Sequence, residues 1–191
     1  MSSGGVERHP EYKHFASIPW CAKILAGFSS PNHVVHVSHN RTILPTGENQ
    51  YVGGTLNTPD TIAAWLVLHP RPRAPDWKVD ELRSLVTFNH GMVGFPGTAH
   101  GGVIALVLDE VTGIHIVAQR PEGAEANKDF RTGYLNTSFY KPVPAPGTVL
   151  VRSRIVKVEG RKHYVAAQIE DEHGQVLAKA EVLYISIRNK L

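Results

Sequence analysis

The sequence predicts an α+β protein in which one long, buried helix covers the apolar face of an antiparallel sheet. Residues 94–119 read GFPGTAHGGVIALVLDEVTGIHIVAQ, a Gly/Pro-rich turn followed by about eighteen residues that are apolar almost all round. The second half of the chain, from Gly133 onward, alternates apolar and polar residues in segments joined by short turns. This order indicates a set of strands, one helix and then several hairpin-connected strands.

The helix in residues 94–119 is the centre of this prediction. Residues 103–108 place an apolar side chain on every face of nearly two helical turns. A helix that is hydrophobic all round is either a membrane span or the centre of a core. Asp109, Glu110 and His115 interrupt the run, which disfavours a membrane span. We therefore expect a helix enclosed by the rest of the fold, with one or two carboxylates held deep within it.

The first fifty residues mix short elements with loops. Residues 1–10 are small and polar and are expected to be disordered. Residues 11–26 carry apolar side chains along one side and predict a short helix, with a break near Pro19. Residues 29–49 contain Pro, Asn, Ser and Gly and predict a loop with one short strand around residues 34–37.

Two strands are expected before the long helix. Residues 50–68 have strand character, with a turn or bulge at residues 57–60. Residues 69–77 contain several prolines among basic residues and predict an exposed loop. A short strand at residues 84–89 then leads into the helix.

Four strands are expected after the helix and a polar connection at residues 120–128. Turns at residues 159–160 and 173–174 separate three of them, and the PVPAPG segment at 142–147 forms a rigid corner. The predicted strands cover residues 133–140, 148–158, 163–171 and 177–187.

Length and composition indicate one soluble domain with an extension. The chain has 191 residues, of which 42% are apolar and 19% charged, as in ordinary globular proteins. We place an N-terminal extension with a short helix at residues 1–50 and the main domain at residues 51–191. The net charge of +3 suits a phosphate-bearing small ligand such as a nucleotide or coenzyme A. The basic residues form no cluster, so no nucleic-acid partner is expected.

Cysteine and histidine usage narrows the chemistry further. The single cysteine, Cys21, excludes an intramolecular disulfide and is consistent with a reducing compartment. The eleven histidines show no HxH or HExxH arrangement, so no metal site and no cofactor are expected. The N-terminal MSSGGVERHPEYKHF has no apolar stretch of a signal peptide. We expect a cytoplasmic protein, and a mitochondrial location stays open.

Three segments together resemble the hotdog-fold acyl-CoA thioesterases, in the PaaI-like or thioesterase-superfamily branch. They are the HGG of residues 100–102 with Asp109 eight residues past Gly101, the TGYLNTSFYKPVPAPG of residues 132–147, and the VEGRKHYV of residues 158–165. The resemblance covers roughly residues 50–187. It implies a curved antiparallel sheet wrapped around the central helix, and a homodimer or dimer of dimers with active sites at the subunit interface.

Thioester hydrolysis needs an oxyanion stabiliser and a group that activates water or attacks the carbonyl. The N–H groups that begin a buried helix are unpaired and lie at the positive end of its dipole, so we assign the Gly101 N–H to the oxyanion hole, with Gly102 nearby. Asp109 is expected to be the general base or the nucleophile, with a pKa that burial would raise. Its neighbour Glu110 is a second candidate for the working carboxylate or for substrate binding, and His100 is expected to fix the loop or carry a proton.

The resemblance implies roles for four further residues. Thr132 would hold the water with its hydroxyl, acting from the opposite subunit. Lys141, Arg161 and Lys162 would contact the phosphates of coenzyme A. One departure concerns Gly94, which stands where relatives often carry a polar Asn.

Other functions of the same fold fit less well or stay open. A dehydratase needs a catalytic His before Phe95-Pro96, where Gly94 stands, and a hydratase pairs Asp with a His five residues on, whereas His115 follows Asp109 by six. An enzyme acting on a carrier-protein-bound acyl or polyketide chain, and a non-catalytic acyl-ligand binder, both remain alternatives. The chain has no Gly-x-Ser-x-Gly motif, which disfavours an α/β-hydrolase.

Overall fold

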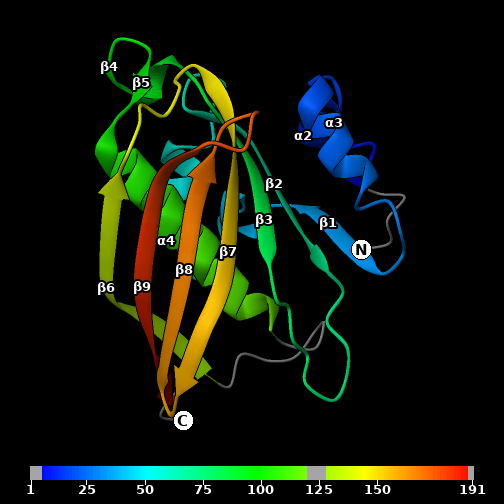
Figure 1. Ribbon diagram of the computed structural model, residues 1–191, viewed down its shortest axis with the longest axis vertical. Helices are drawn as coiled ribbons and strands as arrows, with labels where there is room; N and C mark the ends of the chain where they lie inside the picture. Colours follow the sequence, from blue (N-terminus) through cyan, green and yellow to red (C-terminus); the bar gives the residue numbers. More distant parts are fainter. Residues whose placement is uncertain (1–5, 120–127, 189–191) are drawn as a thin grey trace.

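A seven-stranded antiparallel sheet curves around one long helix, α4 (Gly101–Ala118), in the computed structural model of the protein (Figure 1). The structure describes residues 6–119 and 128–188. The α+β class and the central helix are therefore confirmed. The polar connection predicted at residues 120–128 falls almost entirely outside the described residues.

The strand order of the sheet is β1-β2-β3-β7-β8-β9-β6, and every neighbouring pair is antiparallel. A separate two-stranded ribbon, β4 with β5, immediately precedes α4. The strands are β1 (His33–Val37), β2 (Ile62–Pro70), β3 (Leu82–Phe88), β4 (Val93–Phe95), β5 (Thr98–Ala99), β6 (Lys128–Phe139), β7 (Gly147–Glu159), β8 (Lys162–Glu170) and β9 (Val176–Arg188). The four strands predicted after the helix are confirmed, although β6 begins earlier than expected.

The side of the sheet that faces α4 forms the main core. Val107, Leu108 and Val111 of the helix are fully buried against it. In β7, Val149 and Val151 point toward α4, whereas Arg152 and Arg154 lie on the other face, as the alternation of a strand requires. By length and hydropathy alone, α4 could also cross a membrane. The core helices of soluble proteins meet the same criteria of length and hydropathy, and the sheet wraps around α4.

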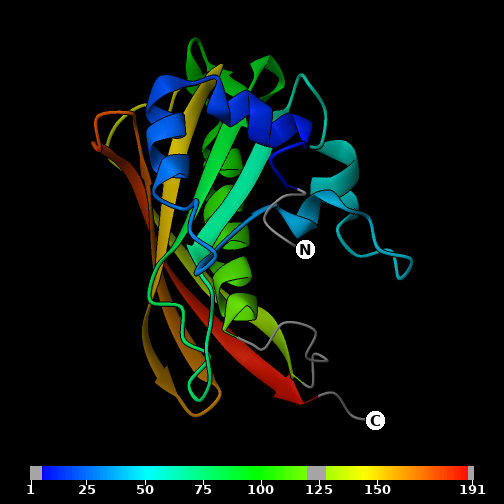
Figure 2. The same cartoon turned by 90° about the vertical axis from the view of Figure 1, so that its right-hand side faces the viewer.

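Two short helices cover the opposite face of the sheet. α2 (Pro10–Ala16) and α3 (Pro19–Ala26) pack on β2, β3 and β7 (Figure 2). Phe15, Cys21 and Leu25 form a second buried cluster there with leucines of these strands, such as Leu66 and Leu85. The sequence suggested one helix broken near residue 19, and the break falls there because a proline fits the first turn of a new helix.

The segment before β2 differs from the prediction. Residues 50–55 were expected to begin a strand, but Gln50–Thr55 forms one π-helical turn, η2. Asn49 precedes it with φ +65°, and a side chain at Gly53 would come within 3.1 Å of the Arg41 backbone. The close packing of this turn therefore overrides its strand propensity. The division at residue 50 stays a prediction; β1, which precedes it, pairs with β2.

A buried ion pair ties α2 to the sheet. One oxygen of Glu11 accepts a hydrogen bond from the Trp65 N–H of β2 at 2.6 Å, and the other lies 2.9 Å from Nε of Arg41. Arg41 belongs to the 3₁₀ turn η1 (His39–Arg41) and also donates to the Ile62 carbonyl at 2.8 Å. Pairing between β1 and β2 ends at Leu66. Glu11 and Arg41 therefore supply hydrogen-bond partners to the Trp65 N–H and the Ile62 carbonyl of β2, which β1 does not reach.

We expect Glu11→Ala to lower the free energy of unfolding by about 2–4 kcal/mol, because it leaves the Arg41 charge and the Trp65 N–H buried without a partner. Urea unfolding followed by tryptophan fluorescence measures this difference. Lys13→Ala, an exposed substitution on the same helix, is the control. A loss for Glu11→Ala no larger than that of the control would contradict the role assigned to this ion pair.

Candidate active site

Asp109 lies midway along α4, and two hydroxyl groups hold its carboxylate. The Thr132 hydroxyl of β6 donates to Oδ1 of Asp109 at 3.0 Å. The Tyr184 hydroxyl of β9 lies 3.0 Å from the same oxygen and 2.6 Å from the main-chain carbonyl of Asp109. Thr132 and Tyr184 are paired residues on neighbouring strands, so the sheet itself places both hydroxyls over the helix.

Tyr184 was not among the predicted site residues. Burial, together with the charge of Asp109, raises the pKa of the Tyr184 phenol, so the group stays protonated and can donate. The hydroxyl reaches the helix because Gly113 has no side chain: a Cβ there would lie 3.3 Å from the Tyr184 oxygen. The sequence carries only a weak signal for this residue. Every second side chain in residues 178–186 is expected to face inward, and Tyr184 is the one among them with a phenolic hydroxyl.

The second carboxylate oxygen, Oδ2 of Asp109, makes no hydrogen bond with any side chain or backbone group in residues 6–119 and 128–188. One oxygen is therefore fixed in place, and the other is left for a substrate or a water. A half-buried carboxylate oriented in this way can accept a proton from water or attack an electrophilic carbon.

Glu110 is the carboxyl group whose pKa is displaced most clearly at this site. Burial and the neighbouring charge of Asp109 raise its pKa from 4.5 to about 7, although a hydrogen bond from Asn40 opposes the shift. Asn40, in η1, donates its side-chain N–H to Oε2 of Glu110. Asn40 was not predicted as a site residue, because the chain brings it to α4 from seventy residues away.

A cavity of about 410 Å³ adjoins these groups. Its walls come from α4, from the first part of β6, from Tyr184 and from N-terminal residues 39–49. Asp109, Glu110 and Thr132 all line it. The cavity therefore joins the predicted carboxylates and the predicted hydroxyl in one space.

The N-terminus of α4 presents one unpaired N–H group. His100 is the N-cap: its Nδ1 accepts from the Gly102 N–H at 3.0 Å, and its carbonyl accepts from Val103 at 2.9 Å. Within the described residues the Gly101 N–H has no acceptor, and Gly101 is exposed. A Cβ at Gly94 would lie 2.8 Å from the Cα of His100, so the loop leaves no room for the Asn that the resemblance implied at this position.

One chain does not bring all the predicted residues together. Gly101 and Asp109 are eight residues apart on one helix, about 12 Å along its axis, so both cannot act on one carbonyl group within a single chain. Lys141 follows the end of β6 that lies beside Gly101, whereas Arg161 and Lys162 lie in the β7–β8 turn at the other end of the sheet.

Thr132 contacts Asp109 within a single chain. The resemblance implied that Thr132 acts from the opposite subunit, which stays a prediction; its hydroxyl already hydrogen-bonds Asp109 of its own chain. The reason is topological, because β6 follows α4 directly in the sequence and passes beside its carboxyl-terminal half.

Residues 96–178 match the family model of the thioesterase superfamily. This segment, less than half of the chain, is similar to the thioesterase superfamily. Within curated proteins, it is 34% identical over 110 residues to the acyl-coenzyme A thioesterase THEM4 of Mus musculus and 31% identical over 110 residues to THEM4 of Xenopus laevis. Each alignment covers 56% of this chain, but only 44% of the mouse protein and 46% of the frog protein. The chain thus spans less than half the length of these relatives.

Several solved structures share the fold. A phenylacetic acid degradation-related protein from Ralstonia eutropha JMP134 is 24% identical, with a TM-score of 0.52 over 75% of this chain and 92% of that one. The protein smu.793 from Streptococcus mutans UA159, solved bound to acetyl CoA, is 18% identical, with a TM-score of 0.50 over 59% of this chain and 85% of that one. These likenesses confirm the hotdog fold.

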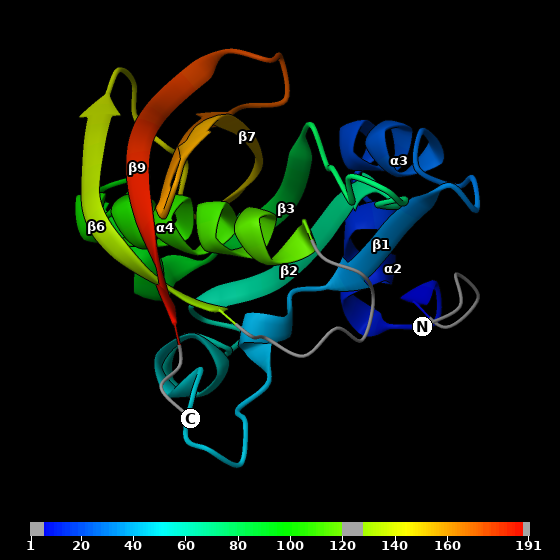
Figure 3. The same cartoon turned by 90° about the horizontal axis from the view of Figure 1, so that it is seen from below.

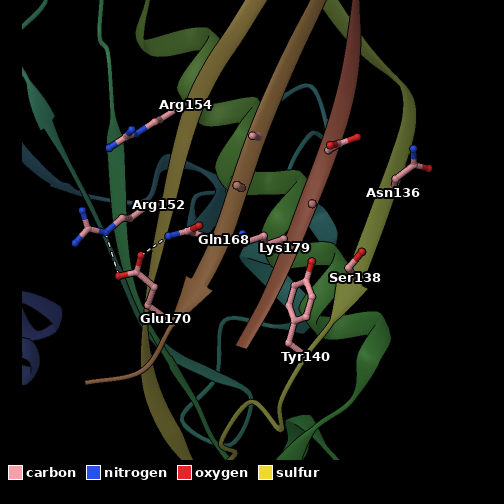
Figure 4. Close-up of a pocket in the computed structure, with 12 residues that line it drawn as sticks. Asn136, Ser138, Tyr140, Arg152, Arg154, Gln168, Glu170 and Lys179 are labelled. Atoms are coloured by element: carbon pink, nitrogen blue, oxygen red, sulfur yellow. Dashed lines mark hydrogen bonds and ion pairs between the residues drawn. The ribbon is translucent and has the colours of Figure 1, made fainter. Parts of the chain in front are cut away.

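A larger cavity, of about 510 Å³, lies on the opposite face of the sheet (Figure 4). Its lining comes from the outward side chains of β6 to β9, including Arg152, Glu170 and Lys179. Arg152 pairs with Glu170 at 3.1 Å, so these charges are largely satisfied among themselves. The sheet separates this cavity from Asp109. Within the described residues, no group of three or more His, Cys, Asp or Glu could hold a metal ion.

We expect Glu110→Gln to change how stability depends on pH. Because the pKa of Glu110 is raised on folding, the folded state binds this proton more tightly than the unfolded state between pH 4.5 and about 7. This carboxyl group therefore costs stability as pH rises through that window, by on the order of 2 kcal/mol at neutral pH. Glu110→Gln should be more stable than wild type at pH 7.5, and the advantage should vanish at pH 4.5. Urea unfolding at both pH values measures it, and an equal difference at both would contradict the assigned cause.

Proposed function

We propose that the thioesterase domain hydrolyses an acyl thioester, converting an acyl-CoA into the free acid and coenzyme A, with Asp109 as base or nucleophile. The observation that carries the proposal is a carboxylate fixed through one oxygen by Thr132 and Tyr184, with its other oxygen facing a cavity. The relationship to proteins named acyl-coenzyme A thioesterase supports the acyl-CoA substrate.

The reaction needs one carboxylate and one oxyanion donor. As a base, Asp109 takes a proton from water while the water oxygen bonds to the thioester carbon; as a nucleophile, it bonds to that carbon itself, and water later hydrolyses the anhydride. In both routes the carbonyl oxygen gains negative charge, which the Gly101 N–H at the positive end of α4 stabilises. In the base route the C–S bond then breaks, and the coenzyme A thiolate takes the proton from Asp109. In the nucleophile route coenzyme A leaves as the thiolate when the anhydride forms, and it is protonated by the proton released when water hydrolyses the anhydride.

Two copies of the chain are needed to bring these groups together. The oxyanion donor must lie about 3 Å from the oxyanion, whereas Gly101 and Asp109 of one helix are about 12 Å apart. β6 is an edge strand of the described sheet, and Tyr134, Phe139 and Tyr140 along it are 38%, 55% and 59% exposed. A long exposed edge of this kind favours pairing with another chain.

Antiparallel pairing of β6 with its copy would complete the site. Phe139 lies beside Gly101, because a Cβ on that glycine would be 3.6 Å from its ring. If the two β6 strands pair about a two-fold axis between Leu135 and Asn136, Thr132 of one copy lies opposite Phe139 of the other. Asp109 of one copy then approaches Gly101 of its partner, and a homodimer has two such sites.

The same arrangement supports the predicted phosphate contacts. Lys141 of one copy would lie near the end of the sheet that carries Arg161 and Lys162 of the other, so three cations from two chains would border the site. An acyl group bound to a carrier protein forms a thioester with the same reacting atoms. Activity toward acyl-CoA substrates therefore distinguishes a coenzyme A thioester from a carrier-protein thioester as the substrate.

We expect Asp109→Asn to lower kcat/KM for acyl-CoA hydrolysis by about 10²–10⁴-fold, because the amide can neither accept the proton nor attack the carbonyl. Thr132→Val should lower it by about tenfold through loss of one hydrogen bond to the carboxylate. Thiol release from short, long and aryl acyl-CoAs measures both effects. The control is Asp76→Asn, in an exposed loop. Full activity of Asp109→Asn would refute its role, and wild type inactive on every CoA ester would point to a carrier-protein substrate.

We expect Gly101→Pro to lower kcat by about 10²–10³-fold, because proline removes the N–H group while fitting the first position of a helix. Gly101→Ala keeps the N–H and is the matched control. Mixing Gly101→Pro with Asp109→Asn after reversible dissociation should restore about one quarter of wild-type activity, since half of the dimers regain one of two sites. An inactive mixture, at a concentration where wild type is dimeric, would contradict a site built from two chains.

A further inference from the structure

One wall of the cavity beside Asp109 comes from the N-terminal part of the chain. Residues 39–49 lie on the side of α4 away from β7 and β8, where Figure 2 shows them in cyan beside the helix. His39, Asn40, Glu48 and Asn49 line the cavity from this side. A bound acyl group would therefore contact residues that lie outside the segment matched by the superfamily model.

Contacts of the neighbouring backbone hold Asn40 in place, independently of its hydrogen bond to Glu110. The carbonyl of the next residue, Arg41, accepts a hydrogen bond from the Asn57 side chain at 3.1 Å, and the Arg41 guanidinium is held by Glu11. Gly53 packs so closely that a Cβ there would lie 3.1 Å from the Asn40 carbonyl. Asn40 is only 8% exposed. The turn thus holds its amide in one orientation against α4.

The hydrogen bond between Asn40 and Glu110 leaves other donor and acceptor groups of both side chains available to a ligand. Asn40 donates one N–H to Oε2 of Glu110 and has a second N–H and a carbonyl. The other oxygen of Glu110, Oε1, makes no hydrogen bond in the described parts of the chain. With a pKa of about 7, Glu110 is present in both protonation states at neutral pH, so it can donate or accept.

The rest of the cavity wall is also mainly polar. Its apolar side chains are Ile114, Val117 and Phe130, next to Gly113. An unbranched alkyl chain laid along this wall would cover Asn40 and Glu110 without bonding to them, which is unfavourable for both groups. A polar substituent would instead bond to them, and would have to lie within a few carbons of the thioester, because Glu110 is adjacent to Asp109.

We propose that Asn40 and Glu110 determine acyl specificity by binding a hydroxyl or oxo group close to the thioester carbonyl, so that the substrates are oxygenated acyl thioesters. The inference rests on the hydrolytic function proposed above. It assigns to the N-terminal segment a part in choosing the substrate, while Asp109 and Gly101 act on the thioester itself.

The test compares two substrates that differ by one hydroxyl group, 3-hydroxybutanoyl-CoA and butanoyl-CoA. Wild type should show a kcat/KM about tenfold higher for the hydroxylated substrate, the usual value of one added hydrogen bond. Asn40→Ala and Glu110→Ala should reduce this ratio to about one. Glu110→Gln, which can still donate and accept, should keep part of the preference. Glu181→Gln, on the other face of the sheet, is the control.

Binding supplies a second readout. Calorimetry with the Asp109→Asn protein should give a Kd about tenfold lower for 3-hydroxybutanoyl-CoA than for butanoyl-CoA, and Asn40→Ala in that background should remove the difference. Equal kcat/KM for both substrates in wild type, or a preference that Asn40→Ala and Glu110→Ala leave intact, would overturn the inference while the thioesterase function stands. A wild type that hydrolyses neither these nor any other acyl-CoA would refute the acyl-CoA function instead.

Discussion

The structure depends on the enclosure of α4. Its side chains are apolar in nearly every direction, so the helix is stable only when other elements cover it on all sides. The curved sheet covers one side and the turns of residues 39–56 cover part of another, as the view from below in Figure 3 shows. Because carboxylates in such a helix are costly to bury, each needs hydrogen-bond partners from the surrounding elements. Asp109 obtains them from β6 and β9, and Glu110 from η1.

The two carboxylates are neighbours on one helix but have different environments. Hydroxyl groups of Thr132 and Tyr184 lie at one carboxylate oxygen of Asp109. Glu110 has one amide partner, and burial together with the neighbouring charge of Asp109 raises its pKa. Adjacent carboxyl groups with separate partners can perform separate tasks, which is the basis for assigning the reaction to Asp109 and substrate selection to Glu110.

The exposed edge of β6 links the fold to the reaction. The strand carries Thr132 at one end and Phe139 at the other, and these ends lie beside the carboxylate and the helix N-terminus respectively. A helix of eighteen residues keeps those two features apart in one chain. In the dimer proposed above, pairing of two copies through this edge would satisfy the unpaired strand and would also bring Asp109 of one copy to Gly101 of the other. Strand pairing and catalysis would then depend on the same contact.

The sequence alone determined the α+β class, the central helix and the four strands that follow it, because periodicity and motif spacing are local properties of the chain. It failed at Gln50–Thr55, where strand propensity gave way to packing against Arg41, and it offered only a weak signal for Tyr184. Asn40 and Tyr184 reach α4 from 70 and 75 residues away in the sequence, so only tertiary structure could place them at the carboxylates. Tertiary structure also decided that Thr132 hydrogen-bonds Asp109 of its own chain, because that contact follows from the path of β6 beside α4.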